Sequence, residues 1–107
     1  MGNPWAGEVV LVLDGTRHVL RLTLGALAEL EATMREDSLV AMVQRFEGGA
    51  FGTRDVIAVL IAGLRGGGWQ GQAVDVLDGE IEGGPVEATR VAAELLGRSF
   101  ALPGLAT

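Results

Sequence analysis

Cysteine is absent from this chain of 107 residues, and histidine occurs once, at position 18. The absence of cysteine excludes a disulfide framework and a thiolate metal site. A metal ion would have to be held by His18 and carboxylates alone, and we expect His18 instead to be a strand residue at the rim of a hairpin. The sequence therefore predicts a protein that has no metal and no other cofactor.

Long apolar runs and basic residues are also scarce. The longest apolar stretch, Val56 to Leu64, is far shorter than the roughly 20 residues that a membrane span requires. The amino-terminal "MGNPWAGE" has no basic segment followed by an apolar one, as a secretory signal would. With 14 acidic and 8 basic residues the net charge is −6, which repels nucleic acid and anionic membranes. These features predict a soluble, cytoplasmic protein with no direct nucleic acid partner and no membrane partner.

Aromatic residues make up only 5% of the chain, although 49% of its residues are hydrophobic. The apolar volume is mostly leucine, valine and alanine, which suits packed helices. The length is typical of one domain, and no repeat or long linker divides it. We therefore predict a single domain over residues 1–107, with flexible termini at about 1–5 and 103–107.

The segment "GEVVLVLDGTRHVLRL", residues 7–22, predicts a β-hairpin that turns at Asp14-Gly15. Asp-Gly tolerates the positive φ angles of a type I′ turn. Pairing outward from this turn sets Leu13 opposite Thr16. A lone hairpin is only marginally stable in water, so helices must cover its apolar face. That face carries Val9, Leu11, Leu13, Leu20 and Leu22.

The rest of the chain has the periodicity of helices. Thr23 is a suitable N-cap for residues 24–34, and Asp37 or Ser38 for a second helix that a glycine pair ends. Residues 54–64, "RDVIAVLIAGL", are apolar nearly all round. This pattern is typical of a helix at the centre of a domain or under a partner.

Two further helices are expected, one over "QAVDVLDGEI" (residues 72–81) and one over "VEATRVAAELLGRSFAL" (residues 86–102). The apolar sides of the first and last helices are expected to include Leu24 and Val86. A hairpin followed by helices is the order of an α+β protein. We predict an α+β fold with an N-terminal β-hairpin at about 7–22, followed by four to five α-helices packed on it.

The segment "GLRGGGWQGQ", residues 63–72, raises the question whether its glycines cradle a phosphate or join two elements. A Walker-type cradle requires a strand before the loop and a lysine after its last glycine. Here a helix is expected before the loop, and Trp69 follows it. We therefore expect Gly66 to end a helix in the left-handed conformation, and the next two glycines to turn Trp69 back onto that helix.

No pairing of a nucleophile with a base is evident. The two serines, Ser38 and Ser99, are not near a histidine in any known nucleophile pattern. Paired carboxylates occur on predicted helix faces or near helix starts, where acidic residues are usually solvated or complement the helix dipole. They are Glu29/Glu31, Glu36/Asp37 and Glu80/Glu82. The sequence predicts a protein that is not an enzyme.

Abundant apolar surface without catalytic chemistry favours a binding role. The unpaired edge of the hairpin could accept another strand or subunit, so a homo-oligomer is one expected state. Candidate protein-interaction residues lie on the second face of the hairpin, in glycine-flanked loops and near the C-terminus: Trp5, Val10, Val12, Val19, Trp69 and Leu102. For the two tryptophans, packing on the edge of the core is the alternative.

Five segments of the chain, in this order, resemble a known family: "NPWAGEVVLVLDG", "LRLTLGALAELEA", "SLVAMVQRFEGGAF", "DVIAVLIAGLRGGG" and "FALPG". They are similar to the small protein that gene transfer agent clusters encode before the tail tape-measure gene. The resemblance covers roughly residues 3–104. The family is described as a tail tube or minor tail protein and also as a tail assembly chaperone. Matching positions, as elements of fold or interface, are Trp5, Gly25, Leu27, Leu30, Gly63, Leu64 and Gly66.

The resemblance implies a non-enzymatic protein of phage-like tail assembly, and it supplies no catalytic residues. A tube subunit needs enough strands to join a β-barrel ring, whereas this sequence has one convincing hairpin. The expected role is therefore a chaperone that reversibly binds the tape-measure protein, with the tail tube protein as a further partner. The alternatives are a structural tail tube or minor tail component, and an unrelated protein-interaction domain.

Overall fold

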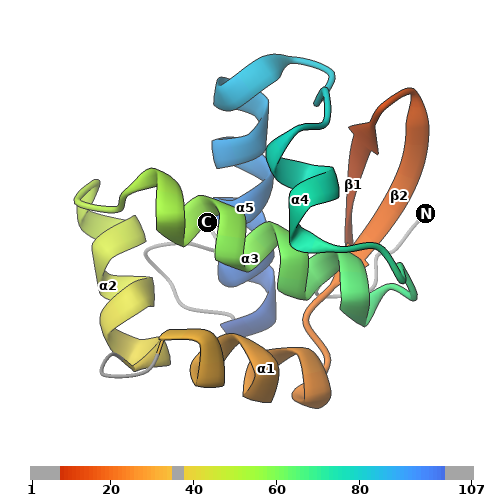
Figure 1. Cartoon of the computed structure of the whole chain (residues 1–107). Coiled ribbons are helices and arrows are strands. Elements are labelled where there is room, and N and C mark those ends of the chain that lie inside the picture. Colours follow the sequence, from red (N-terminus) through yellow and green to blue (C-terminus); the bar gives the residue numbers. More distant parts are fainter. Residues whose placement is uncertain (1–7, 35–37, 101–107) are drawn as a thin grey trace.

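The computed structural model describes residues 8–34 and 38–100. Within these ranges the chain forms a hairpin followed by five helices, which confirms the predicted α+β fold (Figure 1). The predicted flexible termini lie outside the described residues. In chain order the elements are β1 (Glu8–Leu13), β2 (Thr16–Arg21), α1 (Leu24–Met34), α2 (Leu39–Gly48), α3 (Thr53–Gly66), α4 (Ala73–Leu77) and α5 (Gly84–Phe100).

The hairpin has the predicted turn and register. Leu13 pairs with Thr16, and Asp14 and Gly15 both have positive φ angles, of 51° and 81°, as a type I′ turn requires. Because side chains alternate along a strand, this register directs one apolar set to the same face. That set is buried, as expected: Val9, Leu11, Leu13, Leu20 and Leu22.

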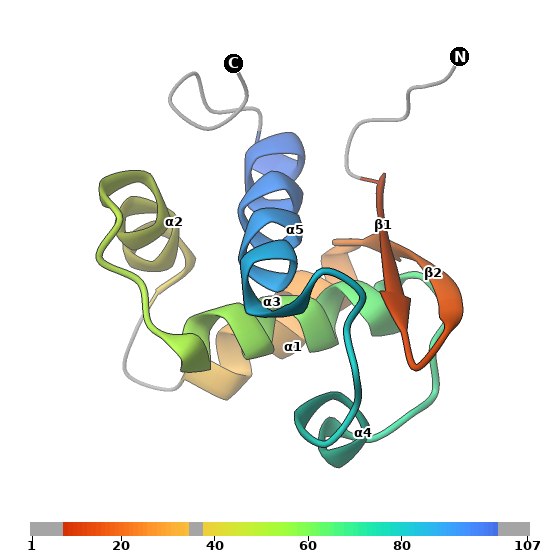
Figure 2. The same cartoon turned by 90° about the horizontal axis from the view of Figure 1, so that it is seen from above.

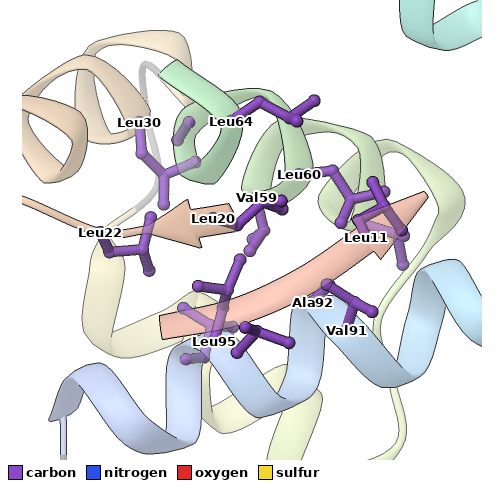
Figure 3. Close-up of a cluster of buried hydrophobic side chains, with 14 of the residues drawn as sticks. Leu11, Leu20, Leu22, Leu30, Val59, Leu60, Leu64, Val91, Ala92 and Leu95 are labelled. Carbon is purple, nitrogen blue, oxygen red and sulfur yellow. The ribbon is translucent and has the colours of Figure 1, made fainter. Parts of the chain in front are cut away.

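Helix α3 is the centre of the fold. It packs against α1, α5 and β2, and α2 and the hairpin lie near its opposite ends (Figures 1 and 2). Leu60 and Leu64 of α3 are 1% exposed and belong to the same buried cluster as core residues of the hairpin, α1 and α5 (Figure 3). The prediction that the apolar helix over residues 54–64 lies at the centre of the domain is confirmed.

Gly63 allows α3, α5 and β2 to approach one another closely. A Cβ at this position would lie 2.7 Å from Leu95 Cδ1 and 3.2 Å from Leu20 Cβ. These separations are shorter than van der Waals contact, so a larger residue would require the side chains of Leu95 and Leu20 to shift. The first glycine of "GLRGGG" is therefore a packing residue of the core.

The helix starts follow the predicted capping residues. Thr23 Oγ1 accepts a hydrogen bond from Ala26 N at 3.1 Å, and Ser38, rather than Asp37, caps α2. The acidic side chain of Asp55 accepts a hydrogen bond from Gly52 N at 2.9 Å at the start of α3. These bonds satisfy amide groups that have no partner within the helix. No helix in the described part of the chain combines the length and apolar character needed to cross a membrane.

Leu24 and Val86 were expected on buried helix sides, and this expectation is wrong. Leu24 is 86% exposed and Val86 is 81% exposed. Each lies two residues before the first buried residue of its helix, Ala26 or Ala88. Two residues correspond to about 200° around a helix axis, so both side chains point away from the core.

The fourth helix is shorter than predicted, because α4 ends at Leu77 and the chain then pairs with the hairpin. Ile81 forms an antiparallel bridge with Leu13. Asp14 N donates to Glu80 O at 2.7 Å, and Glu82 N donates to Val12 O at 3.1 Å. Residues 80–82 thus exchange the expected helical bonds for bonds to β1. Gly79, a poor helix former, precedes this change.

Candidate protein-interaction surfaces

The outward face of the hairpin is the first of two candidate surfaces. Val10 and Val19 are paired across the strands, and Val12 lies on the same face opposite Arg17. Val19 is 45% exposed, whereas Val10 and Val12 are half-buried. The structure therefore brings together three of the predicted interaction residues. Their contact with a partner stays a prediction.

The other predicted interaction residues come from elsewhere in the chain. Trp69 follows α3, is half-buried and packs against the core, in agreement with the alternative of core-edge packing. Trp5 and Leu102 lie outside the described residues. Among the candidate residues that the structure describes, only the three valines therefore lie together.

The edge of β2 is closed by the C-terminal end of α3. A Cβ at Gly66 would collide with the carbonyl oxygen of Arg21, and a Cβ at Gly67 with that of Val19. Both carbonyls belong to positions whose backbone groups point away from β1 in this register. The two glycines therefore bring a helix end against the strand edge. An incoming strand could not pair with β2 at Val19 and Arg21.

The edge of β1 is also largely occupied, so the expectation of an open hairpin edge is wrong. Residues 80–82 bond to β1 near the turn, at Val12 and Asp14. At the other end of the strand, Arg98 Nη1 donates to Glu8 O at 3.2 Å. Sheet edges in folded proteins are commonly protected by such covering segments. The outward valine face, and not the strand edge, is what the hairpin presents.

The glycine-rich segment after α3 joins two elements. The amide groups of residues 67–69 donate to carbonyl oxygens of residues 63–65, at 2.9 to 3.1 Å. Those amides are already bonded, so they cannot cradle a phosphate. The left-handed residue is Gly68, with φ of 105°, and the expectation for Gly66 is wrong. Gly66 itself remains helical. A glycine is required there because the strand carbonyl beside it leaves no room for a Cβ, and not because the chain turns.

The residues considered for catalysis belong to several different elements. His18 belongs to β2 and Ser38 is the N-cap of α2, and these two elements lie near opposite ends of α3 (Figure 1). Glu29 forms an ion pair with Arg65, and residues 36–37 lie outside the described part. Within residues 8–34 and 38–100, no group of three or more histidine or acidic side chains could hold a metal ion.

The second candidate surface is an apolar groove that sequence reasoning missed. It lies between the N-terminal half of α3, α4 and the start of α5, with a volume of about 380 Å³. Leu77 on its wall is 59% exposed. The signal that could have located the groove is the all-round apolar pattern of α3. Its walls include Val56, Ile57, Leu60, Val76, Leu77 and Pro85.

Two ion-pair systems lie in the helical part of the fold. Arg45 of α2 donates two hydrogen bonds to Asp55 of α3, at 3.2 and 2.8 Å. The Arg45 hydrogen bond lowers the pKa of Asp55, since it stabilises the charged carboxylate. Along α5, Arg90 pairs with Glu87 and lowers the pKa of that carboxyl. The first pair links α2 to α3, whereas the second lies within one helix.

A comparison with models of protein families places the chain among the tail proteins of phage-like particles. Residues 6–102 match the family described as "Phage tail tube protein, GTA-gp10". The chain belongs to this family. The resemblance to the gene transfer agent tail family is thereby confirmed. Comparisons with curated proteins and with solved structures found no match.

The family description also bears on the expected role. A tail tube protein is a structural part of a tail, and the description names no tape-measure chaperone. The match therefore favours the structural alternative over the chaperone role that the single hairpin suggested. At the coarser level, the chain is a component of a phage-like tail system.

Proposed function

We propose that this chain is a structural component of the tail of a gene transfer agent particle, held there by contacts with other tail proteins. The match to a tail tube family over residues 6–102 carries the proposal. The outward valine face of the hairpin and the groove between α3, α4 and α5 are surfaces on which such contacts could form. In this role the protein is associated with the particle.

A chaperone that binds the tape-measure protein is the second candidate, and the hairpin edges favour it. A barrel ring needs strands whose edges pair with neighbouring strands. In this fold, α3 lies against the edge of β2, and residues 80–82 pair with β1. A subunit of this fold would therefore join a ring through side chains, whereas a chaperone requires no continuous sheet.

The amount of the chain in purified particles distinguishes the two roles. We would quantify it by mass spectrometry with isotope-labelled peptides, relative to the other tail proteins. A structural component is expected at a fixed whole-number ratio, and retained through washing at high salt. A chaperone is expected in extracts of assembling cells, bound to the tape-measure protein, and at trace amounts in particles. Absence from washed particles would contradict the structural proposal.

A further inference from the structure

A strap of three residues, 80–82, occupies one end of the β1 edge, next to the hairpin turn. It forms one antiparallel bridge, between Ile81 and Leu13, and Val12 O accepts one of its backbone hydrogen bonds. Backbone groups of alternate residues point to the same side of a strand, so those of Val10 face the same edge. Within the described residues, no hydrogen bond joins the strap to Val10. The strap therefore pairs with only the turn end of this edge.

The side chains of the strap alternate as those of an added strand would. Ile81 is half-buried and packs against the core, whereas Glu80 and Glu82 are exposed. Gly83, which follows opposite Leu11 in the same register, has a φ angle of 92° and so leaves the extended conformation. The structure thus shows which kind of segment this edge accepts. It is an extended, antiparallel segment in which apolar and polar residues alternate, and the strap supplies only three residues of it.

The chain on both sides of the strap is suited to movement. The strap is preceded by α4, which has only five residues, and a helix of this length is not stable by itself. It is followed by Gly83 and Gly84, whose φ angles are 92° and 71°, and glycine changes readily between such conformations and extended ones. A hollow of about 930 Å³ lies beside the strap, with a lining that includes Val12, Arg17 and residues 79–85. The strap therefore has space into which it can move.

We propose that the strap is a releasable cover, and that a longer extended segment of a partner protein takes its place on β1. The exchange is favourable because a longer segment bonds to the backbone groups of Val10 as well as to those that the strap holds. It would also replace Arg98 at Glu8 O. In the free chain, the strap protects the edge from indiscriminate pairing. The proposal does not rest on the tail role, since the strap and the strand edge carry it alone.

A disulfide between positions 13 and 81 would lock the strap onto β1. Backbone hydrogen bonds flank this bridge on both sides, so Leu13 and Ile81 form a non-hydrogen-bonded pair. The Cα atoms of such a pair lie about 4.5 Å apart, which is within the range that a disulfide spans. The chain has no cysteine of its own, so Leu13→Cys/Ile81→Cys can form this disulfide alone. The reduced form of the same variant is the matched control.

The probe is a fluorescently labelled peptide of alternating threonine and valine, about seven residues long, with a lysine at each end. Fluorescence anisotropy would measure its affinity for the full chain, and we expect the oxidised variant to bind it about tenfold more weakly than the reduced variant. In the register of the strap, the threonine amides of the peptide face β1 and its valine side chains face the core. Methylation of the threonine amides should therefore abolish binding. Methylation of the valine amides should change the affinity by about twofold or less.

Equal affinity of the oxidised and reduced variants would overturn the proposal, and so would equal effects of the two methylated peptides. Circular dichroism would confirm that each chain is folded. Glu82→Pro is a second test that needs no cysteine, because it removes the N–H that donates to Val12 O. It should bind the peptide more tightly than Glu82→Gln, which loses the same charge but keeps the N–H. Equal affinity of these two variants would also contradict the proposal, and none of these outcomes depends on whether the chain is found in particles.

Discussion

Gly66 and Gly67 show how strongly single residues determine this fold. Both lie at the end of α3, against the carbonyl oxygens of Arg21 and Val19. Neither has a positive φ angle, so close packing, rather than backbone conformation, requires glycine. By contrast, a Cβ at Gly48 in α2 would meet nothing within 4 Å. A side chain would therefore collide with a neighbour at Gly66 but not at Gly48, although both glycines are helical.

We expect Gly66→Ala to destabilise the protein by about 1–3 kcal/mol, because its Cβ would force α3 away from β2. Gly48→Ala is the matched control. It should leave stability unchanged or raise it by up to about 1 kcal/mol, since alanine is the better helix former. Urea unfolding of the two variants would measure the difference. Equal effects of the two substitutions would show that the approach of α3 to β2 is looser than described.

Asp55 makes the free energy of unfolding depend on pH, and the sign of this dependence follows from the direction of its pKa shift. Its pKa is lowered in the folded state, first by the Arg45 hydrogen bond, below its ordinary value of 3.8. The stabilisation is complete above the unfolded-state pKa, and is lost as the pH falls through the lower folded value. Below about pH 4, we therefore expect the unfolding free energy to fall more steeply for the native chain than for Asp55→Asn. Urea unfolding from pH 2.5 to 7 would measure both slopes, and parallel slopes would contradict the prediction.

At the scale of elements, residues 80–82 act as a strap that closes the edge of β1. Asp14 contributes twice, because its N donates to Glu80 O and its Oδ1 accepts from Glu80 N at 2.8 Å. It also has a φ angle of 51°, which asparagine tolerates and alanine does not. The hairpin turn and the strap are therefore coupled through one side chain.

We expect Asp14→Ala to accelerate hydrogen exchange at the Glu80 and Glu82 amides, and to cost about 1–2 kcal/mol. Asp14→Asn keeps an acceptor oxygen and the turn conformation, so its exchange rates should stay near those of the native chain. Exchange measured by NMR would test both variants. Similar rates in Asp14→Ala and the native chain would mean that the strap does not depend on this side chain.

At the scale of the whole molecule, one core joins the hairpin to the helices. Leu95 of α5 and Leu20 of β2 are both fully buried, and both lie beside Gly63 of α3. Because α3, α5 and the hairpin share these contacts, none of them has a core of its own. We infer that the described elements unfold together.

Leu95→Ala should therefore lower the free energy of unfolding by about 3–4 kcal/mol, as large-to-small changes in a tight core do. The loss should appear in one transition, with coincident curves from circular dichroism and tryptophan fluorescence. Leu77→Ser, at an exposed position, is expected to change stability by about 0.5 kcal/mol or less. Separate transitions in Leu95→Ala would show that the hairpin or a helix folds independently.

The predictable part of this protein is its local structure. Asp14-Gly15 sets the hairpin register, Thr23 and Ser38 set helix starts, and the apolar pattern of residues 54–64 indicates a central helix. Each depends on neighbours within a few residues, so the sequence contains the complete signal. The three valines of the outward hairpin face could be grouped for the same reason, since strand side chains alternate.

Only the tertiary structure decided what depends on distant parts of the chain. Bonds to β1 replace helical bonds at residues 80–82, and the end of α3 closes the edge of β2. The groove exists because three successive helices, α3, α4 and α5, leave a gap beside the N-terminal half of α3. Local preference differs by only about 1 kcal/mol per residue. Packing and hydrogen bonds between distant segments outweigh such differences, and determine which surfaces remain open to a partner.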